Sequence, residues 1–162
     1  MIIHVPNKNT LIIGDFKLKC CIGKRGLNYN KKEGDYSTPK GIFYLRKLYF
    51  RKDRIGIPKC KIDKKIIKQN MAWCDDPKHK KYNKEVKTYN KKLKENLYRS
   101  DHKYDYLISI SHNENQIPNK GSAIFIHLTD NYKPTAGCVA LKKKDFEILL
   151  KLIDKKTKIK IG

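Results

Sequence analysis

The sequence lacks any run of about 18 consecutive apolar residues, the length that a membrane-spanning helix needs. Its first residues, M-I-I-H-V-P-N-K, also lack the basic segment and the apolar core of about 7–15 residues that form a secretory signal. We therefore predict no membrane span. We expect either a cytoplasmic chain or a chain whose export signal is missing from this sequence.

Arginine is scarce in a chain that is otherwise very basic. The sequence holds 33 lysines and only 5 arginines, and its formal net charge is +22. Lysine and arginine contacts to phosphate drive nucleic-acid binding, so the charge alone favours that function. Arginine is the preferred bidentate ligand of phosphate and guanine, and a mixture rich in Lys, Ile, Asn and Tyr is typical of A/T-rich codons. We predict no specific nucleic-acid partner and a charge that attracts acidic polymers.

Disulfide and metal-ligand patterns are missing as well. The cysteines are odd in number and form no C-x-x-C pair and no zinc-ligand spacing. They are Cys20, Cys21, Cys60, Cys74 and Cys138. Cys74 is followed by three possible metal ligands, Asp75, Asp76 and His79, but a polar loop after Trp73 is the favoured interpretation. We predict no metal and no cofactor.

Length and hydrophobic pattern predict one mainly β domain. A chain of 162 residues is long enough for one core that buries about 70% of the unfolded surface. Alternating and continuous apolar runs predict strands at residues 2–5, 10–13, 16–22, 42–50, 104–110 and 158–161. Residues 95–99 are expected to form one helical turn. Apolar residues at i, i+3, i+4 and i+7 predict a packing helix near the C-terminus, and they are Phe146, Leu149, Leu150 and Ile153.

The stretch 121–141, G-S-A-I-F-I-H-L-T-D-N-Y-K-P-T-A-G-C-V-A-L, holds a candidate nucleophile and a candidate base. Residues 122–128 are expected to form a buried strand that carries His127, and residues 138–141 a second strand that begins with Cys138. If the second strand returns beside the first as a hairpin, the two side chains meet. A neighbouring imidazole can then take the thiol proton and generate the thiolate nucleophile.

Gly137, directly before the cysteine, favours a backbone that exposes the sulfur and aims successive N–H groups at one point, as an oxyanion hole needs. If His127 is the base, we expect the pKa of Cys138 to lie below the ordinary thiol value of about 8.5. His102 or His112, reaching the sulfur from a neighbouring loop, is the alternative base. The alternative to catalysis is a buried free cysteine and a hydrogen-bonded core histidine that share a hairpin.

These residues resemble the signature of the YkuD-type L,D-transpeptidases, a strand histidine followed by a [Ser/Thr]-His-Gly-Cys segment. The matching residues are His127, Thr135, Gly137 and Cys138. Within the family the chain is most similar to the compact single-domain branch. Four further blocks match in order, E-G-D-Y-S-T-P-K-G-I-F at 33–43, W-C-D-D-P at 73–77, Y-N at 82–83 and L-Y-R-S-D-H-K-Y-D at 97–105.

Two positions depart from the broad signature of the family. Ala136 stands where many members have a second histidine, and Ala140 stands where many have arginine or asparagine. In the family the upstream strand histidine is the one taken as the base, so the loss of the second histidine need not abolish chemistry. The loss of a polar residue at Ala140 leaves the binding of a substrate carboxylate unassigned.

The resemblance implies a mainly β, L,D-transpeptidase-like β-sandwich with a catalytic hairpin and a C-terminal helix, in one catalytic domain over residues 1–162. It implies a cysteine acyltransferase that acts on peptidoglycan stem peptides through a thioester and releases D-alanine. The expected catalytic residues are Cys138, His127 and Gly137, and the expected substrate-binding residues are Thr135, Arg99 and Tyr132. For Arg99, a structural ion pair with Asp101 or Asp105 is the favoured alternative.

Two other functions stay open at this point. The first is an L,D-carboxypeptidase that uses the same Cys-His site with water as the acceptor, and the second is a non-enzymatic basic binding protein. We expect a monomer, and the family implies the cell envelope or periplasm as its compartment.

The charge yields a first test. If the charge of +22 reflects genome composition, binding to duplex DNA should be weak, indifferent to sequence and lost steeply as salt rises. Fluorescence anisotropy with labelled duplexes of different sequence, titrated with salt, measures all three properties. A complex of nanomolar affinity at physiological salt would contradict the expectation and favour the binding-protein alternative.

Overall fold

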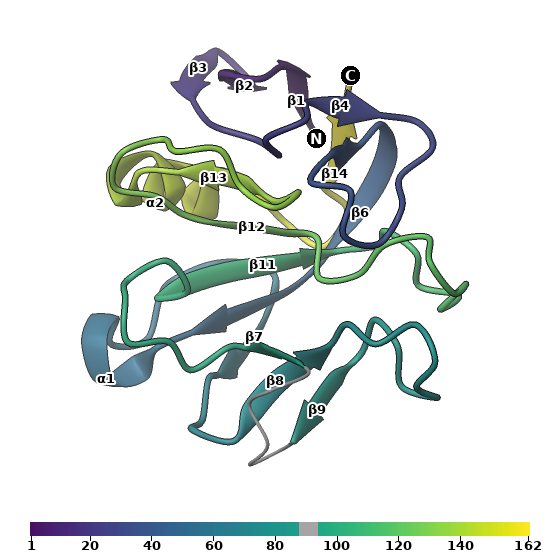
Figure 1. Cartoon of the computed structure of the whole chain (residues 1–162). Coiled ribbons are helices and arrows are strands. Elements are labelled where there is room, and N and C mark those ends of the chain that lie inside the picture. Colours follow the sequence, from purple (N-terminus) through teal and green to yellow (C-terminus); the bar gives the residue numbers. More distant parts are fainter. Residues whose placement is uncertain (88–93) are drawn as a thin grey trace.

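The computed structural model describes residues 1–87 and 94–162 of the chain. Its helices and strands are labelled in Figure 1. Strands dominate the described residues, and the one helix of more than four residues among them lies near the C-terminus. The predicted mainly β fold with a C-terminal helix is therefore confirmed.

Nine strands of the described part form one mixed sheet. The order of its main path is β13 (Val139–Leu141), β12 (Phe125–Leu128), β11 (Tyr106–Ile110), β6 (Gly41–Phe50), β14 (Lys158–Ile161), β1 (Ile2–Asn7), β2 (Thr10–Ile13) and β3 (Phe16–Lys19). The ninth strand, β7 (Asp63–Ile66), pairs with β6 off this path. Sequence-distant strands are therefore neighbours in the middle of the sheet, where β14 lies between β6 and β1.

The two ends of the sheet meet, so that the sheet is nearly closed. Cys21, two residues after β3, forms an antiparallel bridge with Ala140 of β13. The two residues exchange backbone hydrogen bonds of 2.9 Å in both directions. Closure removes an exposed strand edge and fixes the backbone on both sides of Ala140.

Two small sheets and a short helix complete the described elements. β8 (Met71–Cys74) lies between β9 (Glu85–Lys87) and β10 (Lys94–Asn96). β4 (Leu27–Asn28) pairs with β5 (Thr38–Pro39), and α1 (Lys52–Ile55) follows β6. In Figure 1 β8 and β9 lie together, at the end of the molecule away from the two chain termini.

The C-terminal helix α2 (Lys143–Leu152) covers the core beside β12 and β13 (Figure 1). Its predicted apolar positions are buried, because their helical spacing places them on the face that meets the sheet. The ring of Phe146 stacks on Tyr106 of β11, with ring centres 5.3 Å apart and planes 7° from parallel. No helix within the described residues is long and apolar enough to span a membrane.

Two local predictions are wrong. β12 and β13 pair in parallel rather than as a hairpin, with Ile126 opposite Val139, because the connection between them is long enough for the chain to cross back before the second strand begins. Residues 95–99 do not form a helical turn. Glu95 and Asn96 belong to β10, where pairing with β8 supplies the backbone hydrogen bonds that a helix would otherwise make.

Helix α2 provides a test of the core. Phe146→Ala should lower the free energy of unfolding by about 3–5 kcal/mol, because a fully buried ring is lost and a cavity is left. Lys144→Ala, on the exposed face of the same helix, should change it by no more than about 0.5 kcal/mol. Urea unfolding followed by circular dichroism measures both. Equal losses in the two variants would contradict the packing described for α2.

Candidate active site

The pairing of β12 with β13 brings Cys138 and His127 to one face of the sheet. His127 lies opposite Ala140 in the parallel register, and Cys138 precedes β13 by one residue. Side chains alternate between the two faces of a strand, and Ile126 and Val139 point into the main core. His127, Ala140 and Cys138 therefore project from the opposite face, so that a parallel strand pair brings Cys138 and His127 to the same side of the sheet.

A cleft of about 560 Å³ lies over this face, and both Cys138 and His127 line it. Its other lining residues come from segments far apart in the sequence, including Lys31, Ala123 and Thr135. The ionisable side chains among them, apart from the Cys-His pair and Tyr36 and Tyr104, are Lys31, Glu33, Asp75, Glu95, Arg99, Lys103, Asp130 and Lys133. The cleft can therefore hold a ligand that carries charges of both signs.

The thiol of Cys138 is held by two backbone groups. It donates a hydrogen bond to the carbonyl oxygen of Ala123 at 3.2 Å and accepts one from the N–H of Phe125 at 3.3 Å. Burial raises the pKa of Cys138 to about 12, against a smaller opposite effect of the Phe125 N–H. The expectation of a lowered thiol pKa is therefore wrong for the unliganded protein, because burial in a poorly solvated site disfavours the thiolate.

His127 is buried and neutral. Its Nδ1 lies 2.8 Å from the carbonyl oxygen of Leu128. A carbonyl can only accept, so Nδ1 carries the proton and Nε2 keeps a free lone pair. Burial lowers the pKa of His127 to about 4, although the hydrogen bond to Leu128 acts in the opposite direction. The ring also packs edge-on against Tyr104, with ring centres 5.2 Å apart. This tautomer can accept a proton at Nε2.

Thr135 and Gly137 shape the turn that leads to Cys138. The Thr135 hydroxyl donates to the carbonyl of Cys138 at 2.7 Å and accepts the N–H of Gly137 at 3.1 Å. Gly137 has a φ of +150°, and a Cβ there would lie 2.8 Å from the carbonyl oxygen of Ser37. The Gly137 N–H is thus engaged by Thr135. Of the two predicted oxyanion donors, the N–H of Cys138 is the one without a partner among the described residues.

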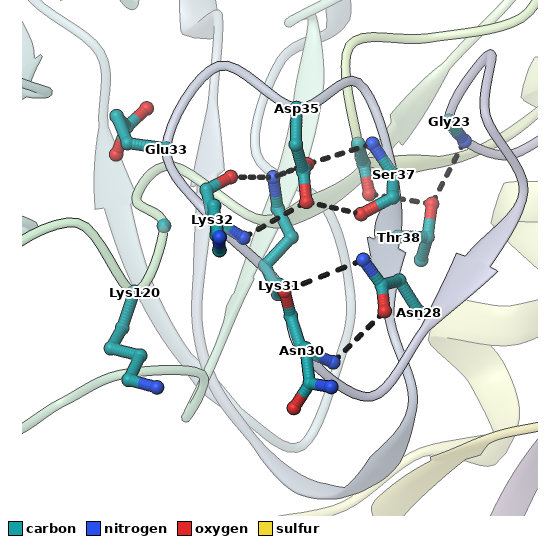
Figure 2. A network of polar contacts seen from close by, with 12 residues as sticks. Gly23, Asn28, Asn30, Lys31, Lys32, Glu33, Asp35, Ser37, Thr38 and Lys120 are labelled. Atoms are coloured by element: carbon teal, nitrogen blue, oxygen red, sulfur yellow. Dashed lines mark hydrogen bonds and ion pairs between the residues drawn. The ribbon is translucent and has the colours of Figure 1, made fainter.

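The segment around Thr38 supports that turn from the other side. The Thr38 hydroxyl donates to the carbonyl of Gly137 at 2.8 Å and accepts the N–H of Gly23, also at 2.8 Å. Figure 2 shows Thr38 joined to Gly23 and, next to it, the network in which Asp35 binds Lys31 and Ser37. Although burial raises the pKa of Asp35, the hydrogen bonds from these neighbours hold it well below its usual value. Because its hydroxyl joins Gly23 to Gly137, Thr38 is a structural support for the turn.

Asn83 supports the thiol indirectly, because it binds the backbone of Ala123, which in turn binds Cys138. Its Oδ1 accepts the indole N–H of Trp73 at 2.9 Å and the backbone N–H of Ala123 at 3.1 Å. Ala123 has a φ of +52°, which is unusual for a residue with a side chain, and its carbonyl accepts the Cys138 thiol. Trp73 and Asn83 lie in two of the matching blocks, but no role was predicted for them, because nothing local in the sequence links them to Cys138.

Arg99 lines the cleft, but its charge is already matched. It makes a two-point contact with Asp101, at 2.9 and 2.6 Å, and this pairing raises the pKa of the guanidinium. Of the two alternatives for Arg99, substrate binding or a structural ion pair, the structure contains the ion pair, and its partner is Asp101. The predicted substrate-binding residue Tyr132 does not line the cleft, and its ring lies by the ammonium groups of Lys19 and Lys142.

The alternative bases do not line the cleft either. His102 pairs with Asp105 at 2.7 Å, and the Nε2 of His112 lies 2.9 Å from the carbonyl of Lys120.

Within residues 1–87 and 94–162, no three His, Cys, Asp or Glu side chains gather as a metal ion would need. All five cysteines are free thiols.

No curated protein matches the chain in sequence, but one solved structure supports the architecture described above. Among solved structures, the helical cell shape determining protein Pgp2 from Campylobacter jejuni shares the fold, with a TM-score of 0.56 and 17% identity over 99% of this chain and 46% of that one. Bd1075 from Bdellovibrio bacteriovorus matches with a TM-score of 0.48 and 15% identity, over 99% of this chain and 47% of that one. The chain thus spans about half the length of these two proteins.

The family comparison covers almost the whole sequence. The model of the L,D-transpeptidase catalytic domain, YkuD, matches residues 2–161. The matched span contains the paired strands β12 and β13, the cleft above them and the helix that covers their other face. The chain therefore belongs to the YkuD family of L,D-transpeptidase catalytic domains.

Proposed function

We propose that this chain is an L,D-transpeptidase, a cysteine acyltransferase that acts on peptidoglycan stem peptides and releases D-alanine. The observation that carries the proposal is the placement of Cys138 and a neutral His127 on one face of the sheet, inside one cleft. Family membership supports the reaction class. Because peptidoglycan lies outside the cytoplasm, we further propose that the chain works in the cell envelope.

In the first half of the reaction, the sulfur of Cys138 attacks the carbonyl carbon of the diaminopimelate residue that precedes D-alanine. The thiol proton passes to Nε2 of His127 as the S–C bond forms. The negative charge on the carbonyl oxygen is stabilised by the N–H of Cys138. Collapse of this intermediate breaks the C–N bond, His127 returns the proton to the departing amine, and D-alanine leaves a thioester on Cys138.

In the second half, an amine of another stem peptide attacks the thioester carbon. His127 takes a proton from that amine, the C–S bond breaks and the thiol is restored. Four carboxylates line the same cleft, Glu33, Asp75, Glu95 and Asp130. A carboxylate in the cleft can bind the ammonium group of an acceptor peptide, and this supports transpeptidation over transfer to water. The L,D-carboxypeptidase alternative differs only in that water attacks the thioester.

The resting pair is neutral, and this determines how it is activated. A thiol with a raised pKa and an imidazole with a lowered pKa do not form a stable thiolate-imidazolium pair. The thiol proton is therefore transferred to His127 while the sulfur attacks, and the negative charge develops on the carbonyl oxygen of the substrate. Burial also protects the thiol from oxidation between turnovers, since the thiolate is the reactive form.

Removing the nucleophile gives the first test of this function. Cys138→Ala and Cys138→Ser should lower D-alanine release to less than about 1% of wild type, because no thioester can form. Mass spectrometry of diaminopimelate tetrapeptides follows both D-alanine loss and joined peptides. Joined peptides indicate a transpeptidase, and D-alanine loss alone indicates the carboxypeptidase.

A matched control is Cys60→Ser, which changes a cysteine that does not line the cleft and should keep full activity. Circular dichroism and urea unfolding verify that each variant folds. The cysteine mechanism would be rejected if Cys138→Ala kept more than a few per cent of the wild-type rate.

The pH profile gives the second test. His127 accepts a proton only when it is neutral, and its pKa is lowered to about 4. The value of kcat/KM should therefore stay level from about pH 8 down to about pH 5 and fall below about pH 4, whereas an unperturbed histidine would give a fall near pH 6.5. Titration of the peptide's own carboxyl groups by NMR separates their contribution from that of the enzyme.

The base itself is tested by His127→Gln, which should lower turnover by about 10²–10⁴-fold. His112→Gln is the matched control and should leave the rate unchanged, because His112 does not line the cleft. A fall of kcat/KM centred near pH 6.5 in wild type, or full activity in His127→Gln, would reject His127 as the buried base.

A further inference from the structure

Four cationic side chains line the cleft, and two of them are already neutralised. Lys31 pairs with Asp35 at 2.5 Å, and Arg99 pairs with Asp101 at 2.6 Å. An ammonium or guanidinium that is matched by a fixed carboxylate has little charge left for a ligand. The other two, Lys103 and Lys133, form no ion pair within the described residues, and both side chains are exposed to solvent.

The backbone holds Lys103 next to the proposed base. The carbonyl of Lys103 accepts the N–H of Leu128 at 2.9 Å, and Leu128 directly follows His127 in β12. Lys103 is therefore fixed at the end of the strand that carries the base, while its four-carbon stem leaves the ammonium free to reach into the cleft.

The charge of Lys103 lies close to two residues that flank Ala140. Ala140 pairs with His127 on one side and with Cys21 on the other. After the larger effect of burial, the Lys103 charge contributes to the lowered pKa of His127, and it also opposes the raised pKa of Cys21. Lys103 and Ala140 line the same cleft, and the small side chain of Ala140 leaves room for a ligand between them.

The chemistry of the first step places a carboxylate in this region. His127 returns a proton to the amine of the departing D-alanine, so that this amine lies beside His127. The carboxylate of the same amino acid is separated from its amine by one carbon atom. It therefore lies within reach of a side chain that is anchored one residue beyond His127.

We propose that Lys103 binds the terminal carboxylate of the peptide substrate and so selects peptides with a free C-terminus. This inference rests on the proposed function, because that function places the departing residue beside His127. Lys103 is a specificity-determining residue in this proposal, and Arg99, the cation suggested by the sequence, holds Tyr104 and Asp101 in place.

Binding measurements test the proposal without requiring turnover. In the Cys138→Ala background, isothermal titration calorimetry compares a stem tetrapeptide that ends in a free carboxylate with the same peptide as its C-terminal amide. The acid should bind about 10- to 100-fold more tightly than the amide, the range expected for a charged hydrogen bond. Lys103→Met should remove this preference by weakening the acid alone, and Lys103→Arg should keep most of it.

Lys133→Met is the matched control, because it removes an equally unpaired cation from the same cleft and should keep the preference. The proposal is overturned if Lys103→Met preserves the preference, if it weakens acid and amide equally, or if neither peptide binds. A preference that depends on Lys103 without any D-alanine release by the intact cysteine protein would reject the proposed function and keep this inference. If D-alanine is released but the preference for the acid over the amide does not depend on Lys103, the proposed function stands and this inference is rejected.

Discussion

The parallel pairing of β12 with β13 is the constraint on which the whole site depends. It places His127 opposite Ala140 and leaves Cys138 just ahead of the strand on the same face. A shift of one residue in this register would turn one of the two side chains into the core. The register is held on the far side by the bridge between Cys21 and Ala140, so the contact that closes the sheet also aligns Cys138 with His127.

Burial then determines the chemical state of the pair. Both groups lie in a poorly solvated region where a charge is costly, and both are neutral at rest. The hydrogen bond from the thiol to the Ala123 carbonyl stabilises the protonated sulfur. The Leu128 carbonyl fixes the proton of His127 on Nδ1 and leaves Nε2 free to accept a proton. In the proposed mechanism, a proton moves from the thiol to Nε2 during the attack and returns afterwards.

Residues far away in the sequence hold this arrangement by satisfying buried polar groups. Thr38 binds the carbonyl of Gly137, and Asn83 binds the N–H of Ala123. In both cases a side chain fixes a backbone unit that lacks a partner in regular secondary structure, and an unpaired polar group there would cost about 1–3 kcal/mol. These contacts give the matching blocks around Thr38 and Asn83 a physical role, which is to support the backbone around Cys138.

The sequence by itself determined the strands on the main path of the large sheet, the packing helix and the candidate pair, because each of these depends on local pattern. Alternation of apolar residues predicts a strand wherever it lies, and the spacing of Phe146, Leu149 and Leu150 predicts a helical face without reference to the rest of the chain. Cys138 and His127 were found for a similar reason, since they stand close together in one matching stretch.

The tertiary structure alone decided three features of the site. They are the parallel direction of the β12–β13 pairing, the neutral state of Cys138 and His127, and which cation of the cleft lacks a carboxylate partner. The direction of β13 depends on the path of its connection, which residue pattern does not encode. The two pKa values depend on burial by segments that are distant in the sequence. Arg99 and Lys103 have the same charge, and only the position of Asp101 neutralises one and not the other. Electrostatic effects depend on distance in space, and the sequence gives only distance along the chain.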